Sequence, residues 1–333
     1  MSNNVTMADV AREAGVSMMT VSRVVNDREG VGPTTRKRVL AVIERLGYRP
    51  SGIARGLATK RTSTLGLVIP DVANPFFADV VRGAEQEAYA RGYQVFLCNS
   101  NENPERELSV LDSLEEKWVD GVILCSSRLD DDVLWEGIDR FPARVLVNRT
   151  LPDHEVGTVL IDDEWGGKAL TEHLLQGGRR AIGVLAGPSA SRSGRERVKG
   201  YRAALAAVDV NYVADRVRPC APTAAGGREV ARSLLADHPE VDALVCYNDL
   251  VAVGALQACV EMDRRVPAGV AVTGYDDILL APLVNPSLTT CRVPRERLGG
   301  AAMRLLLEQI EEQGEGGEEI VLRPKLIVRE SAP

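Results

Sequence analysis

The apolar positions of the chain follow two different patterns on either side of Thr64. Before it, apolar residues recur at helical spacing in short stretches, each bounded by a capping residue or a glycine. After it, runs that are apolar on both faces, such as "LGLVIP", "YQVFLC", "GVILC" and "DALVCY", alternate with amphipathic stretches of helix length. Such runs are typical of parallel strands buried between layers of helices. The pattern therefore predicts a small all-α head and an α/β body.

The head is predicted to contain three short helices. The first is capped by Thr6 and ends at Gly15, and the second is capped by Ser17 and continues to about Val25. The third begins near "GPTTRKRV" and ends at Gly47, with one apolar face formed by Val39, Leu40, Ile43 and Leu46. A helix, a glycine-containing turn and a second helix within about 20 residues form the helix-turn-helix pattern of DNA-binding proteins.

Two methionines, Met18 and Met19, open the second helix at a place where a surface helix usually has polar residues. At about 100° per residue, Val21 and Val24 face the other two helices. Met19 and Arg23 point away from that apolar cluster. Met18 lies at its flank, where it either packs half-buried against the third helix or joins Met19 at the surface. The helix therefore has a face that is free to contact a partner.

The 270 residues from 64 to 333 are many for a single sheet, so we expect two subdomains with a cleft between them. Ligand-binding groups would then gather at the carboxyl ends of the strands, facing the crevice. The predicted division is a helix-turn-helix domain at 1–50, a hinge helix and linker at 51–63, and a body at 64–333 composed of approximately 64–161 plus 291–320 and 162–290 plus 321–333.

Charge is unevenly distributed along the chain. The net charge is −7, but residues 1–64 contain 11 Lys and Arg against 5 Asp and Glu, and the remainder contains 29 against 42. A basic head on an acidic body favours a polyanionic partner for the head alone. The six cysteines form no CxxC pair, no run approaches the roughly 18 apolar residues of a membrane helix, and no export signal is visible at the N-terminus. We expect a cytoplasmic protein without a membrane partner.

Several motifs in order resemble the LacI/GalR family of transcription regulators. They are "TMADVAREAGVSMMTVSRVVND", "YRPSGIARGLATKRTSTLGLVIPDVANPFF", "VNR", "SGRERVKGYRAAL", "YNDLVAVGAL", "VTGYDD" and "PSLTT", which together cover nearly the whole chain. The resemblance implies a multidomain protein with a helix-turn-helix head and a periplasmic-binding-protein-like body of two parallel-sheet subdomains. It further implies a homodimer that binds a near-palindromic double-stranded DNA operator under the control of a small-molecule effector, with repression as the expected output.

The resemblance places DNA contacts on the head and the hinge. Arg23 is the best candidate for a bidentate contact to guanine, whereas the methionines offer apolar contact to thymine methyl groups. Leu57 takes the place of the family's minor-groove wedge and Arg55 precedes it. The polar members fix phosphates or serve as plain helix caps. The full predicted set is Thr6, Ser17, Met18, Met19, Thr20, Ser22, Arg23, Asn26, Thr35, Arg55 and Leu57.

The positions that match the effector-binding residues of the family lie at or just beyond the ends of the strands predicted in the body. Aromatic side chains there suit the C–H faces of a sugar ring, and planar amide, carboxylate and guanidinium groups suit pairs of hydroxyls. The predicted set is Asn74, Phe76, Phe77, Asn148, Arg149, Arg195, Asn248 and Asp276. We therefore expect a sugar or sugar derivative as effector. Sugar-binding relatives often have Asp in place of Asn148, and the less negative site with two arginines also allows a phosphorylated or carboxylated sugar. A purine or nucleoside is the alternative. Asp249 and Asp277 are expected to cap the helices that follow them.

An enzyme is disfavoured by the motifs. The chain contains no GxSxG, HExxH, P-loop or GxGxxG after a strand, and its three histidines, His154, His173 and His238, lie in unremarkable surroundings. We expect no cofactor and no metal. A periplasmic solute-binding protein would share the body, but it should have an export signal and lack residues 1–60. The absence of a heptad tail after "LIVRESAP" favours a dimer over a tail-mediated tetramer.

Overall fold

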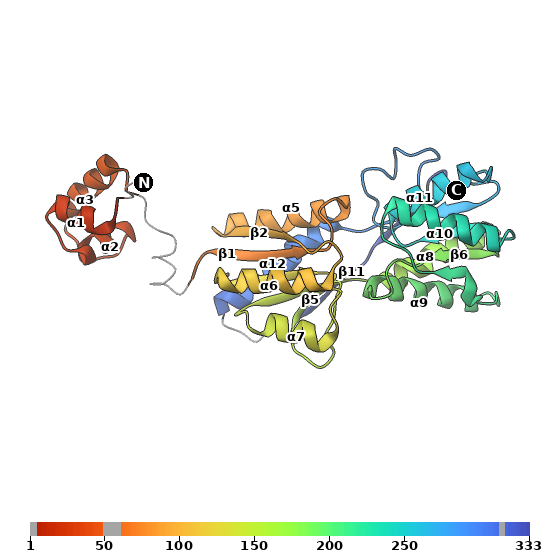
Figure 1. Ribbon diagram of the computed structural model, residues 1–333, viewed down its shortest axis with the longest axis horizontal. Helices are drawn as coiled ribbons and strands as arrows, with labels where there is room; N and C mark the ends of the chain where they lie inside the picture. Colours follow the sequence, from red (N-terminus) through yellow and green to blue (C-terminus); the bar gives the residue numbers. More distant parts are fainter. Residues whose placement is uncertain (1–4, 49–60, 313–316) are drawn as a thin grey trace. The chain divides into compact units, whose positions relative to one another are not determined.

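The computed structural model describes residues 5–48, 61–312 and 317–333, and the chain divides into two compact units, Met1–Thr62 and Ser63–Pro333. Figure 1 shows the helices of the head and the layered elements of the body. The hinge helix expected within 51–63, with Arg55 and Leu57, lies almost wholly outside the described residues.

Three helices form the head: α1 (Met7–Ala14), α2 (Met18–Val25) and α3 (Pro33–Leu46). Thr6 and Asp9 form a reciprocal capping box at the start of α1, and Gly15 and Gly47 end α1 and α3 in the left-handed conformation that glycine adopts readily. These are the helices that the apolar spacing predicted.

A small apolar core holds the three helices of the head together. Its buried members are Val10, Ala11, Ala14, Val21, Val24, Val39, Val42 and Tyr48. The apolar face predicted for α3 was partly wrong, because Leu40 is exposed and Val42 takes the buried position. Val42 lies three residues after Val39, the spacing that keeps two side chains on one side of a helix.

The first lobe of the body is built on a six-stranded parallel sheet in the order β11-β5-β4-β3-β1-β2. Helices α5 and α12 cover one face, and α6 and α7 cover the other (Figure 1). The elements are β1 (Thr64–Ile69), α5 (Pro75–Ala90), β2 (Gln94–Asn99), α6 (Pro104–Glu116), β3 (Gly121–Cys125), α7 (Asp131–Asp139), β4 (Arg144–Val147), β5 (Gly157–Ile161), α12 (Arg295–Glu312) and β11 (Glu319–Leu322).

The second lobe has a four-stranded parallel sheet in the order β7-β6-β8-β9, with α10 and α11 on one face and α8 and α9 on the other. Its elements are α8 (Asp163–Gln176), β6 (Ile182–Leu185), α9 (Arg192–Ala206), the short 3-10 helix η1 (Ala214–Arg216), β7 (Val217–Arg218), α10 (Ala224–Asp237), β8 (Ala243–Cys246), α11 (Asp249–Glu261) and β9 (Ala271–Thr273). The antiparallel pair β10 (Thr290–Arg292) and β12 (Lys325–Ile327) lies on the segments that connect the lobes. Two buried parallel sheets confirm the predicted fold class.

Two details of the body differ from the sequence-based expectation. Strand β2 was expected to be apolar and buried on both faces, but it is the edge strand of its sheet, with Phe96 and Leu97 exposed. Strand β11 continues to Leu322 and belongs wholly to the first sheet, two residues beyond the approximate boundary at 320. Hydrophobicity alone does not distinguish an edge strand from a central one, because both can bury one face.

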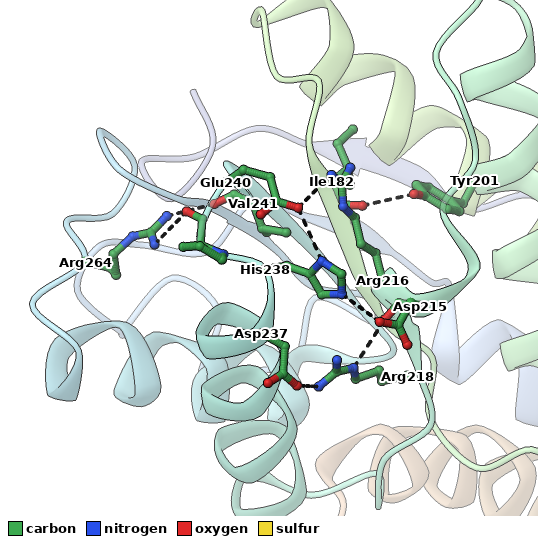
Figure 2. Close-up of polar contacts among 11 residues, drawn as sticks. Ile182, Tyr201, Asp215, Arg216, Arg218, Asp237, His238, Glu240, Val241 and Arg264 are labelled. Carbon is green, nitrogen blue, oxygen red and sulfur yellow. Dashed lines mark hydrogen bonds and ion pairs between the residues drawn. The ribbon is translucent and has the colours of Figure 1, made fainter.

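Charged side chains cover the outer edge of the second sheet beside β7 (Figure 2). The His238 ring lies between two carboxylates, with Nε2 at 3.1 Å from Asp215 Oδ2 and Nδ1 at 3.3 Å from Glu240 Oε1. Arg218 pairs with Asp237 at 2.7 Å. Such charges hinder the pairing of an edge strand with another chain, so this cluster has a structural role.

Candidate nucleic-acid interface and effector cleft

The face of α2 that points away from the head core carries both methionines. Val21 and Val24 are buried, whereas Met18 is 57% exposed and Met19 is 66% exposed. The alternative of a half-buried Met18 is therefore wrong, and the two methionines form one apolar surface at the start of the helix. Exposed thioether side chains gain nothing from the head's own folding, but they adapt to an apolar partner.

Arg23 lies on the same face, four residues after Met19. Its side chain is exposed, and no carboxylate pairs with it among the residues that the structure describes. The guanidinium lies next to Gly30, where an added Cβ would be 3.3 Å from Nη1. Asn26 ends the helix and donates from Nδ2 to the Ser22 carbonyl at 2.8 Å. The outer face of α2 therefore presents an unpaired cation beside the methionines.

Three other predicted DNA contacts of the head, Thr6, Ser17 and Thr20, form hydrogen bonds at helix starts. The Ser17 hydroxyl accepts from the Thr20 amide at 3.2 Å and lies 3.0 Å from the Thr20 hydroxyl. Thr6 accepts from the Asp9 amide. Thr35 is partly exposed in the first turn of α3. Free amides at helix starts are also where phosphate groups bind, so capping and phosphate contact are compatible for these residues.

In the body, an open pocket of about 540 Å³ lies between the two lobes. Residues from the first lobe and from two loops of the second line it: Glu102, Pro104, Arg128, Pro188, Ser189, Ala190, Pro219, Cys220, Ala221 and Pro222. We call it the outer pocket. None of the eight residues predicted to bind an effector lines it.

Asp276 lies at the junction of the lobes and has the properties of a ligand-binding group. It is only 5% exposed, its φ of 108° is unusual for a side-chain-bearing residue, and no hydrogen bond to its carboxyl group occurs within the described residues. Burial raises the pKa of Asp276 well above its ordinary value, although the Arg197 guanidinium acts in the opposite direction. A carboxyl group with so little exposure and no hydrogen-bond partner in the protein has unused acceptor capacity for a ligand.

Arg197 is the cation that lowers the pKa of this carboxyl group most, and the sequence-based prediction did not include it. Its Nε lies 2.9 Å from the fully buried carboxylate of Asp163, and its guanidinium stacks 3.6 Å from the ring centroid of Tyr275 and 5.0 Å from that of Tyr247. Burial lowers the pKa of Arg197, but Asp163, Tyr275, Asp276 and Tyr247 together outweigh this and raise it. The guanidinium is therefore held in place and charged.

Arg195, which the sequence favoured, occupies a different side of α9. Two residues along a helix differ by about 200°, so Arg195 and Arg197 cannot share a face. Arg195 is exposed and donates to the Ser189 carbonyl at 3.1 Å.

The amide side chains predicted for effector binding are engaged within the protein. Asn74 caps α5 and Asn248 caps α11, each through its side-chain oxygen. The Asn148 oxygen accepts from the Ile161 amide at 3.1 Å, and Asn148 adopts a φ of 54°. The side-chain nitrogen of an asparagine that caps a helix can still donate hydrogen bonds. In Asn248 this nitrogen lies 3.3 Å from the Pro222 carbonyl.

Arg149 and the two phenylalanines are also buried. Arg149 binds Asp131 at 2.5 Å and the Leu129 carbonyl at 2.9 Å, which fixes it within the first lobe. Phe76 and Phe77 pack edge to face at 5.0 Å in the core under α5. These contacts leave little of either ring or of the guanidinium available to a ligand.

A second missed cation, Arg128, follows β3 and lines the outer pocket. Its side chain is 5% exposed and forms a two-point ion pair with Glu102 at 2.6 and 3.2 Å. Burial lowers the pKa of Arg128, but the Tyr247 phenol of the second lobe and Glu102 outweigh this and raise it. The Tyr247 hydroxyl lies 3.0 Å from the Ser191 hydroxyl. The loop position of Arg128 carried no signal in a single sequence.

The expected capping roles of two aspartates were wrong. Asn248 caps α11, and Asp249 instead accepts hydrogen bonds from Thr290 at 2.6 Å and from the Ile278 amide at 2.8 Å in a fully buried position. Burial raises the pKa of Asp249 to about 7. No helix follows Asp277, which pairs with arginines of the connecting segments.

The histidines have structural contacts, and none of them accompanies a nucleophile. His173 Nε2 lies 2.8 Å from the Ala332 carbonyl, and His154 stacks on Trp135 with ring centroids 4.0 Å apart. In residues 5–48, 61–312 and 317–333, no three His, Cys, Asp or Glu side chains gather as metal ligands would. Over the same residues, no helix combines the length and apolar composition needed to span a bilayer.

The comparisons with known proteins agree with this arrangement of head and body. Residues 6–51 match the model described as bacterial regulatory proteins of the lacI family, and residues 62–330 match that of periplasmic binding proteins and the sugar binding domain of the LacI family. The chain belongs to the LacI family. Its members among curated proteins include an HTH-type transcriptional repressor PurR from Photobacterium profundum, which is 34% identical over 331 residues that cover 98% of both chains.

Solved structures of LacI family members share the fold over almost the full length. A lac repressor dimer bound to operator and the anti-inducer ONPF aligns with a TM-score of 0.87 at 28% identity, over 99% of both chains. A complex of the transcriptional regulator CelR with cellobiose aligns with a TM-score of 0.76 at 35% identity, over 98% of this chain and 99% of that chain.

Proposed function

We propose that this chain is a sequence-specific DNA-binding transcription regulator, acting in the cytoplasm as a repressor, whose operator affinity is controlled by a small molecule bound between the lobes. The observation that carries the proposal is the outer face of α2. Met18, Met19 and Arg23 are exposed there, without partners among the described residues of the head, on the second helix of a helix-turn-helix. In this motif the second helix enters the major groove. Family membership supports regulation over catalysis.

The charge balance of the cleft favours an uncharged effector. Arg197 is paired with Asp163 and Arg128 with Glu102, and the predicted anion-binding cation Arg149 is held by Asp131. Each of these three cations is already neutralised by a carboxylate, so a phosphorylated or carboxylated sugar would gain less from them than it would lose in hydration of its charge, a loss that a neutral sugar does not incur. The Asp276 carboxyl group suits a pair of ligand hydroxyls, so a neutral sugar is our proposed effector class.

A nucleobase effector is the second candidate, and the tyrosines beside Arg197 are the reason to test it. The rings of Tyr247 and Tyr275 lie next to the Arg197 guanidinium, and planar bases stack on such groups. Here, however, the guanidinium already occupies a face of each ring. A sugar, which needs hydroxyl partners more than a free ring face, fits these residues better.

We propose that two chains associate through exposed apolar side chains of the body. Large apolar residues are exposed on α5 and the edge strand β2 of the first lobe and near α11 of the second: Tyr89, Phe96, Leu97, Val260, Leu279 and Leu283. Exposed apolar surface of this kind is typical of an interface. Two heads would then reach two half-sites of a near-palindrome, and the lac repressor structure above is described as a dimer on its operator.

The proposal requires that effector binds the DNA-competent and DNA-incompetent states unequally, typically by about 1–3 kcal/mol. The test is operator affinity at fixed salt, measured by fluorescence anisotropy, with neutral sugars, sugar phosphates and nucleobases added in turn. We expect a neutral sugar to change the dissociation constant at least several-fold, while Asp276→Asn abolishes this response and retains operator binding. A response to sugar phosphates alone would overturn the assigned effector class.

A further inference from the structure

A second open pocket, of about 430 Å³, lies on the second lobe alone. The later turns of α11 and two loops of the same lobe line it: Leu256, Cys259, Val260, Asp263, Arg264, Arg265, Val266, Asn285 and Pro286. We call it the α11 pocket. None of these residues lines the outer pocket or belongs to the predicted effector set. Cys259 lies about 16 Å along the helix axis from Asn248, which caps α11 at the cleft, so the two sites are separate.

The floor of the α11 pocket is apolar. Leu256 and Cys259 are buried on α11, and the partly buried side chains of Val266 and Pro286 continue the apolar lining from the two loops. Burial raises the pKa of the Cys259 thiol to about 11, so it behaves as a small neutral apolar group. Of the lining residues, Val260 alone belongs to the exposed apolar set proposed above for the association of two chains. The floor therefore does not depend on that association.

Two arginines give the α11 pocket a positive charge. Arg264 donates to the carbonyls of Pro239 at 3.2 Å and Val241 at 2.8 Å, and Figure 2 shows its guanidinium beside Val241. Arg265 is exposed, and its side chain has no hydrogen bond or ion pair within the part of the chain that the structure describes. With Asp263 as the acidic lining residue, two positive charges and one negative charge leave a net charge of +1.

The α11 pocket therefore differs from the outer pocket in its charge balance. In the outer pocket, Arg128 is neutralised by two contacts with Glu102. In the α11 pocket, the fork of Arg265 can bind a carboxylate at two points. A carboxylate carries one negative charge, which matches the net charge of the lining, whereas a phosphate monoester carries about 1.5 to 2 at pH 7 and would place the excess beside Asp263.

We propose that the α11 pocket binds a monocarboxylate with an apolar body, such as an aromatic carboxylic acid. The carboxylate pairs with Arg265, and the apolar body covers Leu256, Val266 and Pro286. A volume of about 430 Å³ is within the range of roughly 300–1,000 Å³ that small-molecule pockets occupy. The inference goes beyond the proposed function, because it assigns a second ligand site outside the cleft and does not require that the protein binds DNA.

The test is isothermal titration calorimetry on the full chain near neutral pH. The probe is 2-naphthoate, with 2-naphthamide as its uncharged analogue and inorganic phosphate as a simple anion. Arg265→Gln removes the proposed partner of the carboxylate. Arg297→Gln, which removes an exposed arginine of α12 that also lacks a partner among the described residues, is the matched control. Asp263→Asn removes the acidic charge and keeps a residue that tolerates the φ of 52° at this position.

We expect 2-naphthoate to bind with a Kd of about 1 mM or lower and at least about tenfold more tightly than 2-naphthamide. Arg265→Gln should abolish this difference, Arg297→Gln should preserve it, and Asp263→Asn should strengthen the binding of 2-naphthoate several-fold. Equal binding of the acid and the amide, an unchanged difference in Arg265→Gln, or absence of binding would overturn the inference. Tighter binding of inorganic phosphate than of 2-naphthoate would overturn the assigned ligand class.

Discussion

The head and the body present their binding groups in opposite ways. In the head, Met19 and Arg23 are exposed and have no internal partner within the described residues. In the body, Arg197 and Arg128 are buried and each is already paired with a carboxylate. The difference follows from the partners. A duplex approaches from outside and supplies its own polar surface, whereas a small ligand enters a cleft whose charges must be satisfied in its absence.

The largest expected effect comes from breaking the most buried pair of the body. Arg197→Met leaves Asp163 as an unpaired buried carboxylate, which should lower the free energy of unfolding of the body by about 3–5 kcal/mol. Urea denaturation of the full chain, followed by the tryptophan fluorescence of the body, measures this. The double variant Asp163→Asn with Arg197→Met should recover most of the loss. Equal stability of the single variant and the wild type would show that the Arg197–Asp163 pair does not stabilise the body.

The buried carboxyl group of Asp249 should make the stability of the body depend on pH, because burial raises its pKa to about 7. Below about pH 4 the carboxyl group is neutral in both folded and unfolded chains. As pH rises towards 7, only the unfolded chain ionises, so this residue costs stability on the order of a few kcal/mol and the loss levels off above the folded pKa. The stability of the wild type relative to Asp249→Asn should therefore fall between pH 4 and 7. Parallel stability curves for the two proteins would contradict the assignment.

A substitution of Arg23 tests whether the exposed binding groups of the head contact DNA bases. Arg23→Ala should weaken operator binding by about 1–3 kcal/mol and relax the preference at one base pair in each half-site. The stability of the head should not change, because the side chain is exposed and unpaired. Arg12→Ala, which removes an exposed arginine paired with Asp9 on α1, is the control. If both variants weakened binding equally on all DNA sequences, Arg23 would contact phosphates and not bases.

The smallest expected effect concerns the cap of α2. Ser17→Ala removes the acceptor for the Thr20 amide and should lower head stability by about 1 kcal/mol. Thermal unfolding followed by circular dichroism detects the change. Ser17→Asp, which restores an acceptor, should recover the stability but weaken DNA binding, because a negative charge would face the phosphates. Recovery of stability and affinity together would remove Ser17 from the DNA contacts.

The same contrast explains what could be predicted from the sequence. The helices of the head follow from local signals, with Val21 and Val24 at helical spacing and Gly15 and Gly47 at the ends. The parallel sheets follow from apolar runs on both faces. Asp276 was recognised through the family motif, and the structure gives it an unpartnered buried carboxyl group.

Distant partners account for what could not be predicted. Arg197, not Arg195, is turned inward because Asp163 and the two tyrosines surround it, and these come from other elements. Asp249 looks like a cap in sequence but binds Thr290, 41 residues away. A local sequence pattern does not reveal these partners of Arg197 and Asp249, because tertiary packing brings them together.

Sequence-specific DNA binding by the head is best tested by selection of bound sequences from random duplex DNA at a stated salt concentration, since nonspecific affinity rises steeply as salt falls. We expect a near-palindromic sequence whose base preference is altered at defined positions by Met19→Ala and Arg23→Ala. Recovery of sequence-blind, salt-sensitive binding, both without ligand and with the sugar panel, would contradict it.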